Sequence, residues 1–470
     1  MPDCDLAVIG GGAAGLSVTA AAAQLGLRVV LIERDRMGGD CLNFGCVPSK
    51  ALLAAAHAAQ AARAAGRLGV CLPEPAIDWA AVQAHVQGAI AAIAPTDSEA
   101  RFRALGADVL RGEARFVSPD ALLVDRRRIS ARRIVVAAGS SPAVPAIPGL
   151  ERQPYLTNTS IFDLTERPDH LLILGGGPIG LEMADAFAGL GSRVTLVEAA
   201  TVAGKEDPEL VAGLRSCLAG RGITLLEQAE VTAVEPGPTL VLDEGRRVAG
   251  SHLLVAVGRR PNLAELDLAA GQVRASQAGI VTDRGLRSLT NRRVYAVGDI
   301  ADPQGIGPRA FTHVGSYHAA IVIRRALFRL PARIDYAALP RVTYTRPELA
   351  QVGMTEAEAR AAGHRIEILR WPLSDNDRAV ADADRAGLVK LIASGGRVRG
   401  AGILAPNAGE MIGLWGLAIA QRVRLAALAS QIVPYPTRAE AGKRAAGSRF
   451  VPRLFAPRTR RLVRLLSRLP

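Results

Sequence analysis

The chain has 470 residues, of which 49% are hydrophobic and 4% aromatic, and its formal net charge is +13. This length favours a globular protein of about three domains, and five scattered cysteines do not form the disulfide framework of a small secreted protein. Nine of the positive charges follow Glu440, beyond which no acidic residue occurs, and aromatic residues are sparse, so we expect no nucleic-acid partner.

Residues 5–35, DLAVIGGGAAGLSVTAAAAQLGLRVVLIERD, predict a strand, a glycine turn, an alanine-rich helix and a second strand. Gly10, Gly12 and Gly15 form a GxGxxG pattern, and Glu33 ends the second strand. Such glycines allow the turn, the approach of a pyrophosphate and close helix packing, while the acid accepts bonds from a ribose. No basic segment precedes this apolar stretch and glycines interrupt it, so we expect a cytoplasmic protein without a membrane span.

The stretch GGDCLNFGCVPSK, residues 38–50, places Cys41 and Cys46 among glycines soon after this first unit. We expect no metal site, because no second Cys or His pair with ligand spacing occurs. Two buried, inert thiols are one alternative. A redox disulfide is favoured, because Lys50 follows Cys46 by one helical turn and its charge favours a thiolate or a reduced flavin anion.

Residues 170–200, HLLILGGGPIGLEMADAFAGLGSRVTLVEAA, repeat the design of the first unit. Gly175, Gly177 and Gly180 give GxGxxG, and Glu198 follows Gly175 by 23 residues, as Glu33 follows Gly10. One GxGxxG alone is weak evidence of a nucleotide site. Two copies, each with a strand, helix and acid in register, predict that the chain binds two dinucleotides.

The composition changes from about Tyr336 onward. NRRVYAVGDIAD, residues 291–302, still predicts a strand that leads into Gly298 and Asp299. LPRVTYTRPELAQVGMTEAEAR, LVKLIASGGRVRGAGILAP and MIGLWGLAIAQRV then predict a mixed sheet with helices. We therefore expect a third domain in this part of the chain.

These motifs resemble those of the pyridine nucleotide-disulfide oxidoreductases, which include dihydrolipoyl dehydrogenase, glutathione reductase and mercuric reductase. GGDCLNFGCVPSK is similar to their redox-active motif, and VVAAGSSPAVPAIPG, LLVAVGRRPN, VYAVGDIA and YTRPELAQVGMTEAEA are similar to other family motifs. The resemblance implies an α/β fold with two Rossmann-like dinucleotide-binding domains and a C-terminal α+β dimerisation domain, in a homodimer. The implied segments are an FAD domain in two parts (1–150 and 276–335), an NAD(P) domain (151–275), a dimerisation domain (336–450) and a basic tail (451–470).

The resemblance also implies roles for individual residues. Cys46 would lie against the flavin as the charge-transfer thiol, and Cys41 would be the interchange thiol that attacks the substrate. Lys50 would lie near flavin N5, paired with Glu182, and Asp299 would bond the ribityl chain. Further cofactor contacts are implied at Ala114, Gly139, Ile179, Gly258 and Thr312.

These roles imply an FAD-dependent enzyme that passes electrons from NAD(P)H through flavin to a Cys41–Cys46 disulfide and on to a small-molecule acceptor. Glu198 favours NADH, because a carboxylate bonds a free ribose 2′-OH and repels a 2′-phosphate. The residues AATVAG after it lack the arginines of NADP-dependent members, and only Lys205 nearby favours NADPH.

IVPYPTRAEAGKRAAG, residues 432–447, departs from the family pattern at one position. Dihydrolipoyl dehydrogenase and glutathione reductase carry a His-Pro-Thr run whose histidine, contributed by the partner subunit, is the acid/base of dithiol exchange. Tyr435 takes its place here, and Glu440 stands where the orienting acid would. Tyrosine, with an ordinary pKa of about 10, is a poor base at neutral pH. His313, in AFTHVG, is the candidate to replace the histidine, although a lone histidine is more often structural.

Mercuric reductases carry a Pro-Tyr pair at this place, so at Tyr435 the chain resembles them more than the other members of the family. They also deliver mercury through a C-terminal cysteine pair, whereas the last cysteine here is Cys217. The acceptor therefore stays open among a small disulfide, a metal ion, a quinone and dioxygen. A dihydrolipoyl dehydrogenase-type dithiol oxidoreductase, an NADH:quinone oxidoreductase and a non-catalytic flavoprotein scaffold remain alternatives.

The stretch FAPRTRRLVRLLSRLP, residues 455–470, places leucines at helical spacing with arginines off that stripe. A helix that packs on the dimer is the favoured interpretation. Weak contact with an anionic membrane surface is the alternative.

Overall fold

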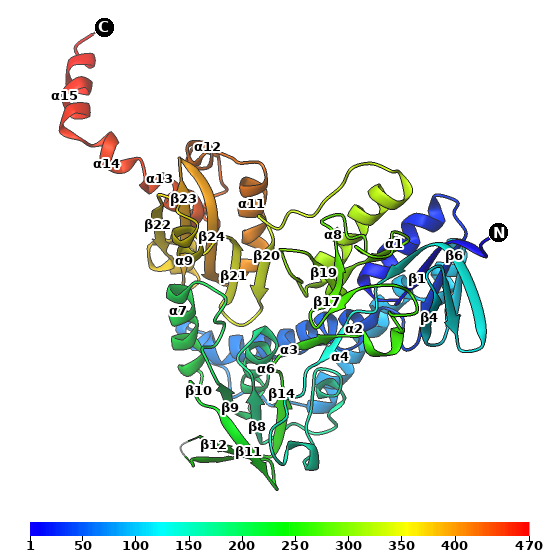
Figure 1. Cartoon of the computed structure of the whole chain (residues 1–470). Helices are drawn as coiled ribbons and strands as arrows, with labels where there is room; N and C mark the ends of the chain where they lie inside the picture. The colour runs from blue at the N-terminus through cyan, green and yellow to red at the C-terminus, as the bar shows by residue number, and fades with distance from the viewer. Residues whose placement is uncertain (244, 470) are drawn as a thin grey trace.

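The computed structural model describes residues 1–243 and 245–469. Sheets of seven, four and five strands form the centres of three regions along the chain (Figure 1). The second region is built on parallel strands, the first on parallel strands with two antiparallel strands at one edge, and the third on an antiparallel sheet.

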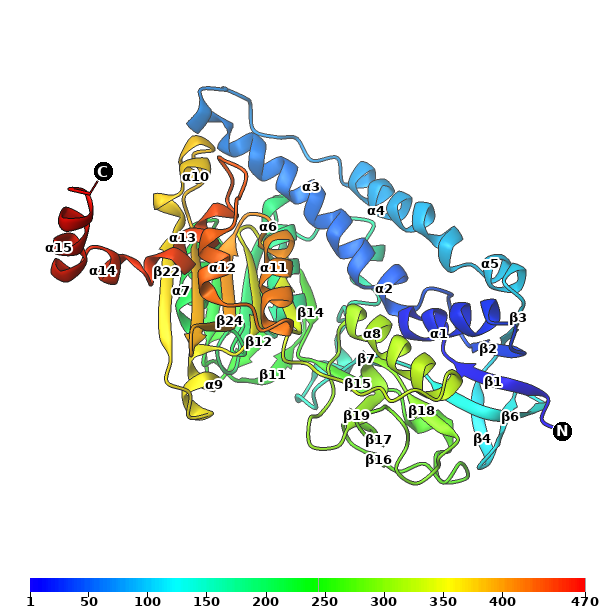
Figure 2. The ribbon, with the colours of Figure 1, turned by 90° about the horizontal axis from the view of Figure 1, so that it is seen from above.

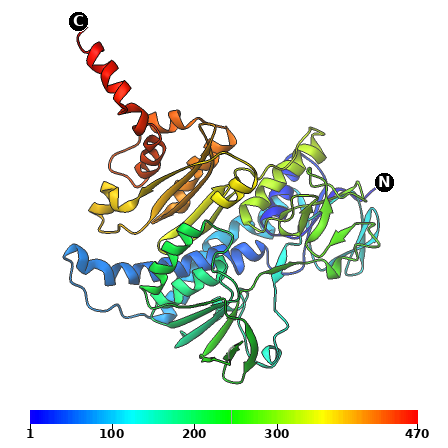
Figure 3. The same ribbon diagram turned by 60° about the vertical axis from the view of Figure 1, so that its left-hand side comes forward.

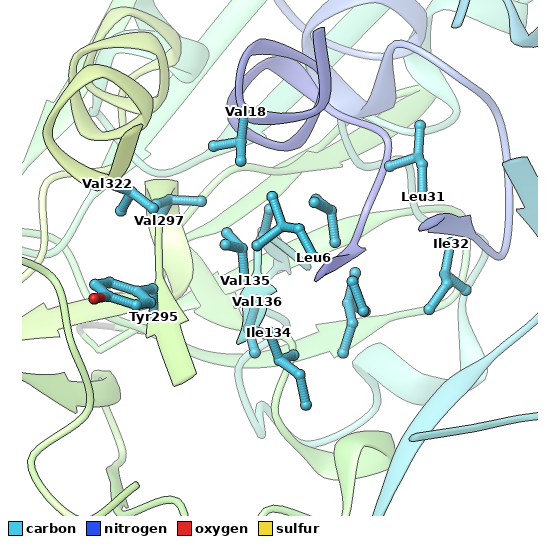
Figure 4. Packing of buried hydrophobic residues seen from close by; sticks show 14 of the residues in the cluster. Leu6, Val18, Leu31, Ile32, Ile134, Val135, Val136, Tyr295, Val297 and Val322 are labelled. Atoms are coloured by element: carbon cyan, nitrogen blue, oxygen red, sulfur yellow. The ribbon is translucent and has the colours of Figure 1, made fainter. Parts of the chain in front are cut away.

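The first sheet has the order β3-β2-β1-β6-β5-β4. A seventh strand, β18, also pairs with β6 but lies outside this order. Its strands are β1 (Cys4–Ile9), β2 (Val29–Glu33), β3 (Ala107–Arg111), β4 (Ala114–Ser118), β5 (Ala121–Val124), β6 (Arg127–Val136) and β18 (Val294–Ala296). Helices α1 (Ala13–Gln24) and α8 (Thr312–Val322) pack on it. Figure 4 shows Val18 of α1 and Val322 of α8 in the same core as the strand residues Leu6 and Val135. Two stretches far apart in the sequence therefore build one sheet.

The second sheet is fully parallel, with the order β10-β9-β8-β14. Its elements are β8 (His170–Leu174), α6 (Pro178–Gly189), β9 (Arg193–Glu198), α7 (Pro208–Ala219), β10 (Thr224–Glu227) and β14 (His252–Val255). A small antiparallel sheet, β11 (Val231–Glu235), β12 (Thr239–Leu242) and β13 (Arg247–Ala249), is inserted before β14. The sequences of these strands are continuous apolar runs such as HLLIL. Such runs are typical of strands whose two faces are both covered by helices or loops.

The third sheet is antiparallel, with the order β20-β21-β24-β23-β22. Its strands are β20 (Pro340–Thr343), β21 (Glu348–Gly353), β22 (Glu367–Pro372), β23 (Leu388–Ser394) and β24 (Arg397–Ala405). The helices of this region are α9 (Glu356–Ala361), α10 (Asp377–Ala381), α11 (Ala408–Ala420), α12 (Leu425–Ser430) and α13 (Glu440–Ser448). Val389, Ile403 and Trp415 belong to its buried core.

A long helix, α3 (Cys46–Ala64), joins the three regions. It follows the short α2 (Gly39–Asn43), lies beside α4 (Trp79–Ile93), and runs past α6 toward the third region (Figure 2). At Gly189 of α6 a Cβ atom would lie 3.0 Å from the Cβ of Ala56, so α3 and α6 approach closely. The chain crosses between the first two regions through the paired strands β7 (Ser140–Pro142) and β15 (Arg259–Pro261).

Shorter elements complete the fold. They are α5 (Glu99–Ala104), β16 (Ala275–Ser276), β17 (Gly279–Thr282) and β19 (Ala301–Pro303). No helix among the described residues is both long enough and apolar enough to cross a bilayer.

The basic tail forms the expected helix. After α13 come α14 (Val451–Leu454) and α15 (Pro457–Leu466), and none of the described residues from 451 onward is buried. The three views agree that this segment leads away from the body of the chain (Figures 1, 2 and 3). Its described side chains therefore stay exposed or half-exposed.

Candidate active site

The two cysteines of the redox stretch are neighbours. Cys41 lies on α2, and Cys46 is the first residue of α3. A Cβ at Gly45 would lie 3.0 Å from the carbonyl oxygen of Asp40 and 3.4 Å from the Cα of Cys41. Glycine is required at this position because the two helices approach so closely. Both cysteines carry free thiols in this structure.

The surroundings of the pair separate the pKa values of the two thiols. A hydrogen bond from Cys41, one from Thr312 and the charge of Lys50 lower the pKa of Cys46 to about 6, against the effect of burial. The Thr312 hydroxyl lies 3.2 Å from the Cys46 sulfur. The bond to Cys46, together with burial, raises the pKa of Cys41 well above its ordinary value. A thiolate at the start of α3 is also favoured by the helix dipole.

The redox stretch docks directly on the first glycine turn. The Gly38 N–H donates to the Gly11 carbonyl over 2.9 Å. Gly39 has a φ of +60°, and a Cβ there would lie 2.7 Å from the Cα of Gly12. The glycine pair before Cys41 therefore lets the stretch rest on the turn, since a side chain at residue 39 would push it away.

The first glycine turn fits the dinucleotide function predicted for it. A Cβ at Gly15 would overlap the carbonyl oxygen of Gly10, so only glycine allows this helix-strand packing. Gly12, at the start of α1, has no atom closer than 3.7 Å to its Cβ position, which leaves room for a phosphate. Glu33 accepts the Gly11 N–H over 2.6 Å at the end of β2. These residues can hold the pyrophosphate and ribose of FAD.

The second turn repeats this geometry. Gly180 packs against the carbonyl of Gly175, and a Cβ at Gly177 would meet no atom within 4 Å. Glu198 accepts the Gly176 N–H over 2.7 Å and the Ala200 N–H over 2.9 Å. Its carboxylate is thus fixed at the end of β9, where a ribose diol of a nicotinamide nucleotide would bind.

The expected pairing of Lys50 with Glu182 is present. The Lys50 Nζ atom lies 2.6 Å from Oε2 of Glu182, and Glu182 is only 5% exposed. The other carboxylate oxygen accepts the backbone N–H of Tyr344 over 3.1 Å. Lys50 Nζ also lies 4.4 Å from the centroid of the Tyr344 ring. Three regions of the chain therefore meet one turn beyond Cys46.

Asp299 belongs to a second polar cluster. The Ser140 hydroxyl donates to Asp299 over 2.6 Å, and burial raises the pKa of this carboxyl. The guanidinium of Arg259 lies 3.8 Å from Asp299 and 3.2 Å from Asp40, the residue before Cys41. Asn158 also donates to Asp40, over 2.9 Å. Asp299 and the redox stretch are thus joined through one arginine.

Sequence reasoning missed several of these residues. Arg259 stands inside the quoted motif LLVAVGRRPN, which was the available signal, but nothing there indicated its partners. His318 accepts the Gly298 N–H over 3.0 Å, and burial lowers its pKa to about 4, so it is a neutral acceptor that fixes the turn before Asp299. Asp40 and Tyr344 also stand inside quoted motifs, GGDCLNFGCVPSK and YTRPELAQVGMTEAEA, but nothing there indicated their partners.

The remaining expected cofactor positions are distributed around the two turns. Gly139 follows β6 and Gly258 precedes β15, both have positive φ, and a Cβ at either would meet no atom within 4 Å. Ile179 lies in the first turn of α6. Ala114 is buried in β4, so its contact with a cofactor would involve its backbone.

The surroundings of Tyr435 differ from the expectation. Tyr435 is 68% exposed, and its hydroxyl donates to Asp377 over 2.8 Å, a bond that raises the pKa of Tyr435. Glu440, the expected orienting acid, instead pairs with Arg444 over 2.8 Å, one turn along α13. The reason is local: helix geometry places residues 440 and 444 side by side, and α10 brings Asp377 to Tyr435.

His313 follows Thr312 in the sequence and hydrogen-bonds to the backbone of the third region. Its Nε2 atom lies 3.1 Å from the Pro340 carbonyl, and burial lowers its pKa. Within the described residues of one chain, no hydrogen bond or ion pair joins Tyr435, Glu440 or His313 to the two cysteines. Nor do the described residues include a group of three or more His, Cys, Asp and Glu side chains arranged to hold a metal ion.

Two family models match the chain. The model of the pyridine nucleotide-disulphide oxidoreductases covers residues 4–357, and the model of the dimerisation domain of these enzymes covers residues 339–446. Together with the structural matches below, they confirm the predicted fold class: two dinucleotide-binding units and a dimerisation domain.

Similar proteins span nearly the whole chain. A mercuric reductase from Streptomyces lividans is 38% identical over 94% of this chain and 95% of its own length. A dihydrolipoyl dehydrogenase from Geobacillus stearothermophilus is 31% identical over 93% of this chain and 94% of its own. The solved structure of the HOCl-induced flavoprotein disulfide reductase RclA from Escherichia coli is 27% identical, with a TM-score of 0.84, over 94% of this chain and 99% of that one.

Proposed function

This chain belongs to the pyridine nucleotide-disulphide oxidoreductase family, and from that premise we propose that it carries electrons from NADH through Cys41 and Cys46 to a thiophilic metal ion. It is an FAD-dependent, NAD(P)H-linked oxidoreductase, and its dimerisation domain makes it a homodimer. The family leaves open the role of each residue, the choice of donor and the acceptor.

The contacts of the two thiols carry the proposal, because they make the two pKa values unequal: Cys46 begins α3, and its sulfur lies 3.2 Å from the Thr312 hydroxyl. With a pKa of about 6, Cys46 is a thiolate at neutral pH, and Cys41 donates its proton to that thiolate. We assign Cys46 to the flavin side of the pair and Cys41 to the acceptor side. When Cys41 attacks, its proton moves along the existing bond to the Cys46 sulfur, so the first proton transfer needs no histidine.

The residues around the glycine turns would hold the cofactors. Gly12, Glu33 and Asp299 would bind FAD, and Gly177 and Glu198 would bind NADH. When bound, FAD would supply the two-electron chemistry that connects the reduced nicotinamide to the disulfide. Lys50, fixed by Glu182, keeps a positive charge beside the Cys46 thiolate.

Glu198 supports NADH as the donor. Two backbone N–H groups hold its carboxylate in place, so the negative charge cannot turn away from a 2′-phosphate. Lys205, the nearby cation that would favour NADPH, is exposed on the following loop.

A metal ion suits the site better than a dithiol. Dithiol exchange needs an acid/base at the position of Tyr435, and the bond to Asp377 raises the pKa of that tyrosine further from neutrality. A soft cation binds to both sulfurs, and the one proton that the pair retains is released to water, so no protein base is needed. The similar proteins include mercuric reductases, and the solved structures include a Cu(II) complex of RclA.

An anaerobic acceptor screen tests this function. The FAD-loaded enzyme is reduced with NADH, and Hg(II), Cu(II), lipoamide, glutathione disulfide and quinones are compared as oxidants. Hg(II) or Cu(II) should reoxidise the enzyme fastest, and Cys41→Ser should slow that step by about 100-fold or more. Cys71→Ser, at an exposed cysteine outside the site, is the matched control and should keep the full rate. A full rate in Cys41→Ser, or preference for a quinone, would contradict the proposal.

A further inference from the structure

The segment after the dimerisation domain takes no part in the reaction proposed above. The family model of that domain ends at residue 446, so α14 and α15 lie beyond both matched regions. Their described residues are exposed or half-exposed, and the segment leads away from the body of the chain (Figure 3). Their surface is therefore available to a partner outside the chain.

Helix α15 separates apolar from basic residues. At 3.6 residues per turn, Leu462, Leu465 and Leu466 fall within an arc of about 100°. Arg460 and Arg464 lie on the opposite side of the helix, and Arg461 borders the leucine arc next to Leu465. All three leucines are more than half exposed, at 54%, 62% and 51%. Arg458, in the first turn, lies on the leucine side, where its long stem can reach outward to a polar boundary.

The apolar surface continues into α14. Val451, Leu454 and Phe455 are also exposed large apolar residues. They precede α15 directly, and Arg453 stands among them. A short segment thus presents two apolar patches bordered by arginines, without an acidic residue to neutralise them.

The charge distribution favours an anionic bilayer over a second copy of the chain as the partner of α14 and α15. Of the 57 basic residues nine follow Glu440, so the first 440 residues have 48 basic and 44 acidic residues and a net charge of +4. A basic tail gains no long-range attraction from a body that is itself positive. An anionic lipid surface attracts it and accepts its leucines.

Nucleic acid is the other polyanion that such a tail could meet. A phosphate backbone would pair with the arginines but leave the leucine face in water. The bilayer interface accommodates both faces of α15 at once, because leucines enter the acyl boundary while arginines stay among the headgroups.

We propose that α14 and α15 form a peripheral membrane-docking element that binds anionic phospholipid surfaces. A homodimer carries two such elements, one on each subunit. The docking goes beyond the proposed electron transfer and does not depend on it. The reaction would then take place at a membrane surface.

Vesicle co-sedimentation of the FAD-loaded full-length dimer tests the docking. Vesicles of phosphatidylcholine mixed with phosphatidylglycerol should pellet the protein, whereas pure phosphatidylcholine should not. Binding should weaken between about 0.01 M and 0.15 M salt, since the Debye length falls from about 30 to about 8 Å. Equal binding to both vesicle types would overturn the proposal.

Two sets of substitutions separate charge from apolar insertion. Arg460→Ser, Arg461→Ser and Arg464→Ser together should weaken binding on the order of 100-fold. The matched control removes three exposed charges elsewhere and should have little effect. It comprises Arg126→Ser, Arg127→Ser and Arg128→Ser. Equal losses in both sets would show non-specific attraction and overturn the docking.

A leucine variant distinguishes the bilayer from other anionic partners. It comprises Leu462→Ser, Leu465→Ser and Leu466→Ser. This variant keeps every charge and should lose vesicle binding. Undiminished binding would overturn insertion.

Removal of residues 457–470 should abolish binding, leave NADH oxidation unchanged and leave the dimer intact in sedimentation velocity. Dissociation of the truncated dimer would instead assign the tail to the subunit contact and overturn the proposal.

Discussion

Lys50 and Glu182 form an ion pair of 2.6 Å between α3, which begins with Cys46, and α6, which begins at the second glycine turn. Glu182 is buried, and its second oxygen holds the backbone of Tyr344. The pair therefore connects the nicotinamide-side helix to the thiolate, and a shift of α6 on nucleotide binding would reach the cysteines through one contact.

The members of this pair act on Cys46 with opposite sign. The charge of Lys50 lowers the pKa of Cys46, and the charge of Glu182 raises it. Lys50→Met should therefore raise the pKa of Cys46 above about 6, and Glu182→Gln should lower it. The pH dependence of thiolate ultraviolet absorbance in the reduced protein measures both. If both variants moved the pKa in the same direction, rearrangement of α3 rather than charge would be the cause.

The hydrogen bond from Cys41 is the largest influence on the pKa of Cys46. Cys41→Ala removes this donor, so the pKa of Cys46 should rise, and at pH 6 less of the thiolate should be present. The rate of alkylation by iodoacetamide at pH 6 should fall in this variant and recover at higher pH, because only the thiolate reacts. Thr312→Val, which removes the donor 3.2 Å away, should cause a smaller change in the same direction.

Sequence reasoning was most successful where a function depends on residues close in the sequence. Each GxGxxG unit and the cysteine pair lie in continuous stretches with fixed spacing. The contacts that it missed join distant residues: Arg259 and Ser140 are 119 positions apart, and Tyr435 and Asp377 are 58 apart. Such pairs depend on how β7 meets β15 and how α10 lies against the loop before α13, which local periodicity does not encode.

The family resemblance also predicted one contact between residues that are far apart in the sequence. Lys50 and Glu182 are 132 positions apart, and only the family motif linked them in advance. For Tyr435 the same analogy pointed to Glu440, whereas Asp377 provides the acceptor in this chain. The family pattern thus indicated the position but not the partner, because the residue that the family carries at that position is a histidine and not a tyrosine.

Gly39→Ala tests the docking of the redox stretch on the first turn. The substitution places a Cβ 2.7 Å from the Cα of Gly12 at a φ of +60°, so backbone must move. We expect a loss of stability of at least about 1–3 kcal/mol, with weaker FAD retention. Gly26→Ala is the matched control: its φ is +79°, but no atom lies within 4 Å of the Cβ position. Equal losses of thermal stability and FAD in both variants would show that the φ angle alone matters.

Lys390 tests the contact between the second and third regions. Lys390 is 3% exposed, and its Nζ atom lies 2.9 Å from a carboxylate oxygen of each of Asp207, Glu209 and Glu356. Lys390→Met would leave the buried Asp207 without its cation, at a cost of about 3–5 kcal/mol. The thermal midpoint of unfolding should fall clearly at pH 7.

The pH dependence of this loss has a definite sign. The pKa values of Glu209 and Glu356 lie below the ordinary 4.5, chiefly through bonds from Arg370 and Arg360 and then from Lys390. Groups with a lowered folded-state pKa stabilise the protein above their unfolded pKa, and this contribution is lost as the pH falls through the folded value. The difference between wild type and Lys390→Met should therefore be full at pH 7 and shrink below pH 4.5. A constant difference across that range would mean that packing of the lysine stem, and not its charge, stabilises the contact.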